Sequence, residues 1–316
     1  MSHSRFSPSS SSRWINCPAA AILAENYPDS TNSAAEEGTL AHKLSERFLV
    51  YGHSIDNITL EECNSMLGED VSDEMLDNVN QYVEYCREIA HDNYHRDVSS
   101  LNVETAVDFG RYAPGGYGTA DAIILDYSGG KIHVLDFKYG RVRVDAFKNT
   151  QLMLYALGVY SCMPSGHRDM VHDFVLHVCQ PRVFDGFTTY TVSVEELLAF
   201  GETIKEKSAL ALADNPERIA GVVQCKWCPA KGDCSALAEH SKDIVMFDCD
   251  DMTNEAVLPD VEKLTSKQRK LILDSQATIV AFMQAVSDSA NPEIGVAAVE
   301  GCLLLGSRAG TGLIAH

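Results

Sequence analysis

The sequence predicts an α/β or α+β sandwich in which helices flank a central mixed β-sheet. Two changes of hydrophobic periodicity support this prediction. Apolar residues recur with helical spacing in the first third of the chain, alternate with period two over the next segments, and then return to helical spacing. Glycine-rich stretches separate the alternating segments, as is typical of turns between strands. The strands are therefore expected in the middle of the chain, with helices before and after them.

The N-terminal region is expected to be helical after a short leader. Residues 1–13 are rich in serine and are predicted to form a disordered leader. Trp14–Glu25 is predicted to be a short helix with Pro18 near its start, where proline is tolerated. Gly38–Tyr51 and Asp73–His91 have helical spacing of apolar residues, so both are predicted to be amphipathic helices.

Three strands are predicted in the middle of the chain. Period-two patterning covers Leu101–Phe109, Thr119–Tyr127 and Lys131–Phe137. Gly115–Gly116 and Ser128–Gly130 separate these segments, and the second of these stretches suits a β-hairpin. We therefore expect an antiparallel meander of three strands.

The second half of the chain is predicted to extend the sheet and add helices. Asp145–Tyr160 has helical spacing, whereas Asp173–Gln180 and Thr188–Ser193 have the composition of strands. Further helices are expected at Ser193–Asp214 and, as one long amphipathic segment, at Leu264–Ser287.

Composition and charge restrict the function. The chain has 316 residues and a net charge of −20, which argues against a generic nucleic-acid binder because phosphate contacts need Lys and Arg. Residues 131–148 nevertheless carry five basic side chains against two aspartates. No apolar run reaches the roughly 20 residues that span a bilayer, and the N-terminus lacks the apolar region of a secretory signal. A cytoplasmic location is expected, in which the ten cysteines are free thiols or metal ligands.

The chemistry is expected at the end of the third predicted strand. Asp136 and Lys138 share one face of that strand, because side chains alternate with period two. Asp121 on the preceding strand brings a second carboxylate to the same end if the two strands form a hairpin. Converging carboxylates suit Mg²⁺ or Mn²⁺, and Lys138 would stabilise the negative charge of a phosphoryl transition state. Taken alone, the same residues also fit a surface Asp–Lys pair.

Further motifs occur before and after this strand. The segments are Gly38–Glu46, Gly118–Asp121, Asp136–Lys138 and Gln151–Tyr155. In this order they resemble the motifs of the PD-(D/E)xK nuclease superfamily, in its RecB-like, Cas4-like and AddB-like group, and the similarity spans Trp14–Cys234. The pattern is especially similar to a phage-associated family of unknown-function proteins of the DUF2800 type.

The resemblance implies a restriction-endonuclease-like core with a central mixed β-sheet. It divides the chain into the leader, a nuclease domain over residues 14–240 and a helical C-terminal extension over residues 241–316. The implied activity is that of a Mg²⁺- or Mn²⁺-dependent DNA nuclease, an exonuclease in phage DNA recombination or processing. The protein would be encoded by a phage or prophage and would act in the bacterial cytoplasm.

The resemblance also assigns metal ligands. It gives this role to His42, Asp121, Asp136 and the backbone carbonyl of Phe137. As a lone histidine on a helix, His42 is equally consistent with an ordinary core or surface position, and only the surrounding motifs favour a ligand.

The remaining site residues follow from the same resemblance. Lys138 is expected to position the attacking water or to stabilise the scissile phosphate. Gln151 and Tyr155, four residues apart on one helical face, would line the site and contact DNA. Glu46 and Glu104 are candidates for accessory roles near the metal, and Glu104 fits an exposed strand position equally well.

The expected macromolecular partner is DNA. Arg141, Arg143 and Lys148 would form a local basic groove for it, while the acidic exterior limits nonspecific binding. A phage recombinase, an annealing protein or a helicase is a candidate protein partner, and a homo-oligomer stays open. Two alternatives stay open as well: an adaptor that binds DNA ends without cutting them, and a nuclease that acts on RNA.

A cysteine cluster follows the nuclease motifs. Cys225, Cys228 and Cys234 have the spacing C-x2-C-x5-C, which is typical of a metal site that needs a fourth ligand. Cys17 is the best candidate for that ligand. The resemblance implies that the four thiolates hold a [4Fe-4S] cluster, which would join the two ends of the nuclease domain. Structural Zn²⁺ is the main alternative, and unligated thiols are the other.

Overall fold

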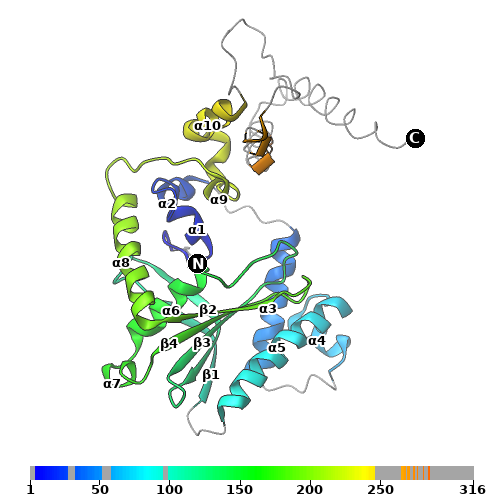
Figure 1. The fold of residues 1–316 in the computed structure, drawn as a ribbon. Coiled ribbons are helices and arrows are strands. Elements are labelled where there is room, and N and C mark those ends of the chain that lie inside the picture. The colour runs from blue at the N-terminus through cyan, green and yellow to red at the C-terminus, as the bar shows by residue number, and fades with distance from the viewer. Residues whose placement is uncertain are drawn as a thin grey trace, which may run out of the picture. The chain divides into compact units, whose positions relative to one another are not determined.

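A five-stranded mixed sheet forms the centre of the fold (Figure 1). Neighbouring strands pair in antiparallel fashion, except β3 and β4, which are parallel. The predicted α/β fold with a central mixed sheet is therefore confirmed, and so is the antiparallel meander of its first three strands. The strands, in spatial and chain order, are β1 (Ser99–Asp108), β2 (Tyr117–Asp126), β3 (Lys131–Phe137), β4 (Asp173–Cys179) and β5 (Phe187–Ser193).

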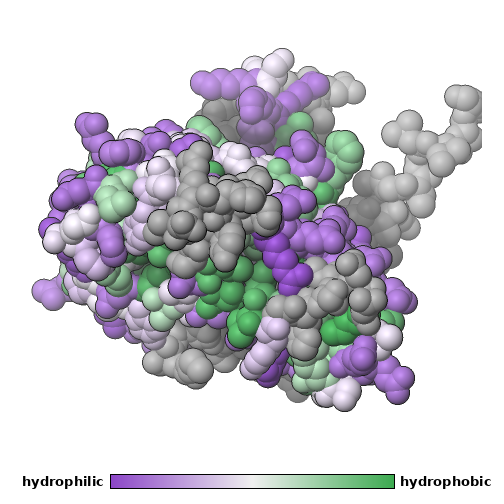
Figure 2. Space-filling model, turned by 90° about the horizontal axis from the view of Figure 1, so that it is seen from below, coloured by the Kyte–Doolittle hydropathy of each residue, from purple (hydrophilic) through white to green (hydrophobic). Residues whose placement is uncertain are grey.

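The structure is a computed structural model that describes residues 4–27, 33–51, 58–94 and 99–245, with isolated positions between 265 and 284. In that part of the chain, no helix is long and apolar enough to cross a membrane. The predicted long helix after residue 263, and most of the expected C-terminal extension, lie outside the described residues. Figure 2 shows one face of the molecule, on which hydrophobic side chains are exposed among hydrophilic ones.

Three helices cover one face of the sheet (Figure 1). They are α3 (Ser33–Tyr51), α4 (Leu60–Leu67) and α5 (Asp73–Tyr94). Leu44, Phe48 and Tyr82 from these helices pack with Ile124 and Phe137 of the sheet in one buried core. Periodicity did not predict α4, although a capping box marks its first turn.

The opposite face of the sheet is covered by α6 (Thr150–Cys162), which contacts β1 to β4. The helix begins five residues later than predicted, because the Asn149 side chain accepts hydrogen bonds from the N–H groups of Gln151 and Leu152 and so caps it. Helix and sheet approach closely at Gly158, where an added Cβ would lie 2.8 Å from the Val107 Cβ. The short helix α7 (Ser165–Arg168) follows α6, and α8 (Val194–Ala211) follows β5.

The prediction of a disordered leader is wrong for the described residues from Ser4 onward. Pro8–Ser10 forms the short helix η1, which packs against α6, and Phe6 and Pro8 are buried. The Ser11 hydroxyl lies 2.7 Å from the hydroxyl of Thr150 at the start of α6. Serine-rich composition favoured disorder, but the two apolar side chains bury enough surface to order the segment.

The chain divides into two compact units, and the expected nuclease domain over residues 14–240 stays a prediction. The first combines Met1–Ser12 with Pro28–Ala209, and the second combines Arg13–Tyr27 with the chain from Leu210 onward. The helix predicted over Trp14–Glu25 is interrupted around Pro18, which lacks the N–H that an uninterrupted helix needs. The helical segments in this region and in the second unit are α1 (Ser11–Trp14), α2 (Ala20–Leu23), η2 (Ala24–Asn26), α9 (Val222–Cys225), η4 (Pro229–Asp233) and α10 (Ser235–Val245).

Candidate metal and phosphate site

Acidic residues of three neighbouring strands lie at the same level of the sheet. Because Val103 pairs with Ala122 and Thr105 with Ala120, Glu104 lies opposite Asp121. Because Ala122 pairs with Leu135, the next position along β2 and β3 brings Asp121 opposite Asp136. Side chains that face each other on neighbouring strands lie about 5 Å apart. The pairing of the strands therefore gathers three carboxylates that are distant in the sequence.

His42 completes a group of potential metal ligands. A nitrogen of its ring and one carboxylate oxygen each from Glu104 and Asp121 all lie within 4.8 Å of one another. His42 Nδ1 is 3.5 Å from Asp121 Oδ1. The helix α3 supplies this histidine and, one turn later, Glu46, whose charge reaches Glu104. Two carboxylates and an imidazole suit a divalent cation such as Mn²⁺ or Mg²⁺.

Glu104 is the residue of this group for which the sequence fitted a metal-site role and an exposed strand position equally well. Its backbone has φ 45°, a left-handed conformation that costs energy for a residue other than glycine and is concentrated at functional sites. Burial and the charge of Asp121 raise the pKa of Glu104 to about 7. Both features are expected of a carboxylate held in a site that a cation would stabilise.

Asp136 contacts Lys138 and Gln151 rather than joining the group of three. Lys138 Nζ lies 2.9 Å from Asp136 Oδ2 and donates to Gln151 Oε1 at 3.0 Å. Gln151 Nε2 donates to Asp136 Oδ1 at 2.9 Å and to the Tyr155 hydroxyl at 3.1 Å. The predicted Gln151–Tyr155 face of α6 thus meets the end of β3, and the network holds the lysine ammonium in one place.

Asp136 and Tyr155 of this network are buried, whereas Lys138 and Gln151 are partly buried. Asp136 is 2% exposed, and its Oδ2 atom forms an ion pair with the Lys138 ammonium. Burial raises the pKa of Asp136. Burial alone would lower the pKa of Lys138, but the charges of Asp136 and Asp121 outweigh it, so the pKa is raised and the ammonium stays charged. The Lys138 ammonium, 2.9 Å from Asp136 Oδ2, therefore supplies the positive charge that this buried carboxylate needs.

Phe137 approaches the site through its main chain and supports it with its ring. Its N–H donates to Asp121 Oδ2 at 2.7 Å, which fixes the carboxylate on the strand pair. Its ring stacks on Tyr82 with centroids 4.6 Å apart and lies 5.3 Å from the His42 ring. The metal role of the Phe137 carbonyl stays a prediction.

The three basic residues predicted to bind DNA all lie in the loop between β3 and α6. Arg141 forms an ion pair with Glu74 at 2.8 Å, so part of its charge is neutralised. Arg143 donates to the carbonyl of Phe184 at 3.1 Å. Lys148 lies over an aromatic ring of the same loop. The loop therefore places these cations at the edge of the sheet where β3 ends.

The four predicted cluster cysteines all belong to the second unit. Burial raises the pKa of Cys225, a hydrogen bond from the Gly221 N–H opposes this, and the charges of Cys228, Cys234 and Cys17 raise the pKa further. That the four thiols hold one bound group stays a prediction.

Backbone groups already support two of these sulfurs. The N–H of Ile219 donates to Cys17 Sγ and the N–H of Gly221 to Cys225 Sγ, each at 3.4 Å. Arg13 donates to the carbonyl of Trp227 at 3.0 Å, and its charge lowers the pKa of Cys228 against the larger effect of burial. Hydrogen bonds to sulfur and a nearby cation both stabilise the thiolate form that ligates metals.

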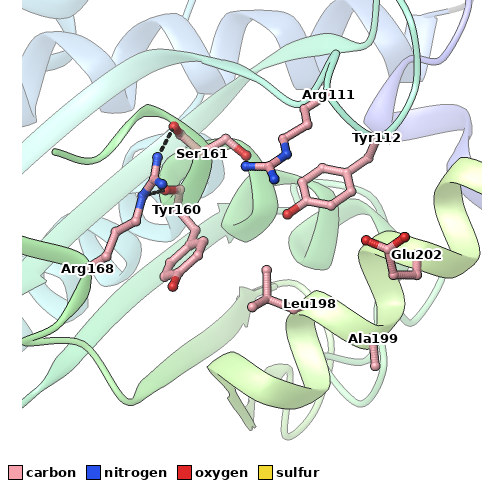
Figure 3. A pocket seen from close by; sticks show the side chains of 8 residues that line it. All are labelled: Arg111, Tyr112, Tyr160, Ser161, Arg168, Leu198, Ala199 and Glu202. Atoms are coloured by element: carbon pink, nitrogen blue, oxygen red, sulfur yellow. Dashed lines mark hydrogen bonds between the residues drawn. The ribbon is translucent and has the colours of Figure 1, made fainter. Parts of the chain in front are cut away.

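A pocket of about 440 Å³ lies at the other end of α6, between its last turn, the β1–β2 turn and α8 (Figure 3). Arg168 caps α6 there by donating to the carbonyls of Tyr160 at 2.9 Å and Ser161 at 2.6 Å. Gln151 and Tyr160 are about 14 Å apart along the helix axis, at about 1.5 Å per residue. The pocket is therefore separate from the carboxylate site.

Two comparisons with known proteins bear on the chain. A solved structure described as "Crystal structure of SSO0001" is similar at 14% identity with a TM-score of 0.29, over 69% of this chain and 95% of that one; no conclusion depends on it. The model of the family described as "Protein of unknown function (DUF2800)" matches residues 3–301, which is nearly the whole chain. The chain therefore belongs to the DUF2800 family.

Proposed function

We propose that the protein is a metal-dependent DNA nuclease of the PD-(D/E)xK superfamily and acts as an exonuclease. One observation carries the proposal: the group of His42, Glu104 and Asp121 adjoins the ion pair of buried Asp136 and partly buried Lys138 at one end of the sheet. This arrangement combines oxygen and nitrogen ligands for a cation with a fixed ammonium group.

The first group would hold Mg²⁺ or Mn²⁺. The donor set fits, because Glu104 and Asp121 offer carboxylate oxygens and His42 an imidazole nitrogen within 4.8 Å of one another. A cation there would lower the pKa of a bound water molecule and polarise a phosphate oxygen. Asp121 is held ready for this role, since the Phe137 N–H fixes one of its oxygens and leaves the other facing His42.

Lys138 would stabilise negative charge on the scissile phosphate. Asp136 and Gln151 hold its ammonium from two directions, and the charges of Asp136 and Asp121 keep it protonated. A preorganised cation of this kind stabilises the charge that develops in a phosphoryl transition state. Gln151 and Tyr155 then act as positioning residues, because they fix Asp136 and hence the lysine.

The test uses end-labelled linear DNA with Mg²⁺, Mn²⁺ or a chelator. We expect degradation with either cation and none with the chelator, while a closed circular DNA survives because it offers no end. Lys138→Ala is expected to reduce the rate by at least about 100-fold, as loss of one preorganised charge-stabilising donor does. Lys131→Ala, at the other end of the same strand, is the matched control. Equal rates for Lys138→Ala and wild type would refute the proposal.

We further propose that Cys17, Cys225, Cys228 and Cys234 hold a [4Fe-4S] cluster in the second unit. The membership of the four thiols in one unit, their mutual electrostatic influence and the N–H donors to two sulfurs support it. Anaerobically purified protein is expected to be brown and to contain about four irons per chain. Cys225→Ser should lose the colour and iron, whereas Cys162→Ser, at an exposed cysteine of α6, should retain both. Colourless protein with one zinc per chain would contradict the cluster and leave the nuclease proposal standing.

A further inference from the structure

A fully exposed aromatic side chain lies beside the candidate site. Phe184, in the turn between β4 and β5, is 96% exposed. Since β3 and β4 are parallel, their C-terminal ends meet at one edge of the sheet. The Lys138 N–H donates to the carbonyl of Cys179, the last residue of β4, at 2.8 Å. The turn that carries Phe184 thus starts directly beside the strand that carries Lys138.

Ion pairs fix this turn to the helices on one face of the sheet. The Arg182 guanidinium contacts Glu37 of α3 at 3.1 Å and Glu74 of α5 at 3.0 Å. It also lies 4.4 Å from the centre of the Tyr139 ring. Two residues before Phe184, the chain is therefore anchored, and the guanidinium is nearly buried at 8% exposure.

The backbone around Phe184 is equally constrained. Arg143 donates to the Phe184 carbonyl at 3.1 Å. Asp185 has φ 53°, and an added Cβ on Gly186 would lie 2.0 Å from the Gln180 carbonyl oxygen, so this tight turn excludes larger residues there. The turn holds the ring out into solvent in a defined position, although water is unfavourable for an aromatic side chain.

Gln180 joins this turn to the loop that follows β3. Its Nε2 donates to the carbonyls of Gly140 at 2.6 Å and Val142 at 2.9 Å, and its Oε1 accepts from the Val144 N–H at 2.9 Å. The joined loops expose Phe147 as well, at 65%. Arg143 and Lys148 lie among these apolar side chains, so the surface combines aromatic rings with positive charge.

We propose that Phe184 stacks on an unpaired base of the DNA strand next to the scissile phosphate. This proposal rests on the proposed nuclease function. It specifies the substrate of the nuclease as a DNA strand whose terminal bases are unpaired. Aromatic rings interleaved with cations are the surface that single-stranded nucleic acid takes, since bases stack on the rings and phosphates pair with the cations. A base paired within a duplex hides its faces in the stack and cannot use Phe184.

The binding test uses the Lys138→Ala background, which keeps the DNA intact during measurement. A fluorescein-labelled single strand and a blunt duplex of equal length are titrated by fluorescence anisotropy. Phe184→Ala is expected to weaken single-strand binding by at least about fivefold, the lower limit for loss of one base–aromatic stack, and to leave duplex binding within about twofold. Phe184→Trp should restore single-strand affinity, whereas Phe184→Leu should not.

Met170→Ala is the matched control, because Met170 is an exposed apolar residue close before β4, at the other end of that strand. It should bind both DNAs as the parent does. An oligonucleotide with 2-aminopurine at its end reports stacking directly, and its fluorescence should be quenched by the parent and not by Phe184→Ala.

The outcomes separate this inference from the nuclease proposal. Equal single-strand binding by Phe184→Ala and its parent, full rescue by leucine, or no single-strand binding by the parent would each overturn the stacking role, whether or not the wild type cuts DNA. A wild type that cuts nothing under any cation, combined with aromatic-dependent single-strand binding, would refute the nuclease and retain the stacking surface.

Discussion

Asp121→Asn is expected to abolish metal binding and to reduce DNA cleavage by at least about a thousandfold. The substitution removes one negative charge from the group of His42, Glu104 and Asp121. A bound cation supplies several kcal/mol of transition-state stabilisation, and about 4 kcal/mol corresponds to a thousandfold in rate. The asparagine oxygen can still accept the Phe137 N–H, which donates to Asp121 Oδ2 in the native chain, so the strand pair should survive.

Calorimetric titration with Mn²⁺ and a thermal melt test this expectation together. The variant should show no Mn²⁺ binding heat in the range where the wild type saturates, and an unchanged melting temperature without metal. Asp108→Asn is the matched control, since Asp108 is an exposed aspartate at the end of β1 whose Oδ1 accepts a hydrogen bond from the Gly110 N–H. Wild-type Mn²⁺ affinity in Asp121→Asn would remove this group as the metal site.

The second large expected effect is a loss of stability in acid, caused by buried His177 and partly buried His133, which lie close to Tyr85 of α5. Tyr85 Oη lies 2.9 Å from His177 Nδ1, and His177 Nε2 lies 3.0 Å from His133 Nδ1. The contacts are satisfied when Tyr85 donates to a neutral His177, which in turn donates to His133. Burial and then the charge of His133 lower the pKa of His177 to about 3, and burial lowers the pKa of His133 as well.

The free energy of unfolding is therefore expected to fall with acidification below about pH 6.5. In the unfolded chain His177 binds a proton near its ordinary pKa of 6.5, whereas in the folded chain it resists protonation until about pH 3. Each pH unit in this window thus costs about 1.4 kcal/mol of stability, and above pH 6.5 the contribution vanishes. The whole window amounts to about 5 kcal/mol from this one side chain.

Urea unfolding at several pH values measures this slope. His177→Gln should be less stable at neutral pH, because it perturbs the contacts to Tyr85 and His133, but its stability should depend less on pH between 6.5 and 4. His167→Gln, at an exposed histidine of α7, should retain the wild-type dependence. An identical slope in His177→Gln and wild type would show that other groups cause the acid sensitivity.

Sequence patterns predicted the elements that carry the site better than the contacts within it. Period two placed Asp136 and Lys138 on one face of β3, and helical spacing placed Gln151 and Tyr155 together on α6; the structure joins all four in one network. These predictions needed only local geometry, because side-chain direction follows from the type of element.

Glu104 shows what local geometry cannot provide. Its place opposite Asp121 depends on the register between β1 and β2, which the intervening turn sets, and its left-handed backbone has no counterpart in hydrophobic periodicity. The sequence also failed to predict that the N-terminal residues are ordered, for a related reason. Composition describes a segment by itself, whereas Phe6 and Pro8 are ordered because other parts of the chain cover them.

The division of the second unit between the two ends of the chain fixes an order of events during synthesis. Cys225 leaves the ribosome 208 positions after Cys17, and at about 5–20 residues per second this delay is roughly 10 to 40 s. During that time all residues of the sheet have emerged and can fold, while Cys17 has no partner thiol from its own unit. The larger unit is thus able to finish first, and a chain that stops before residue 225 keeps the strands yet leaves the segment around Cys17 without the residues that complete its unit.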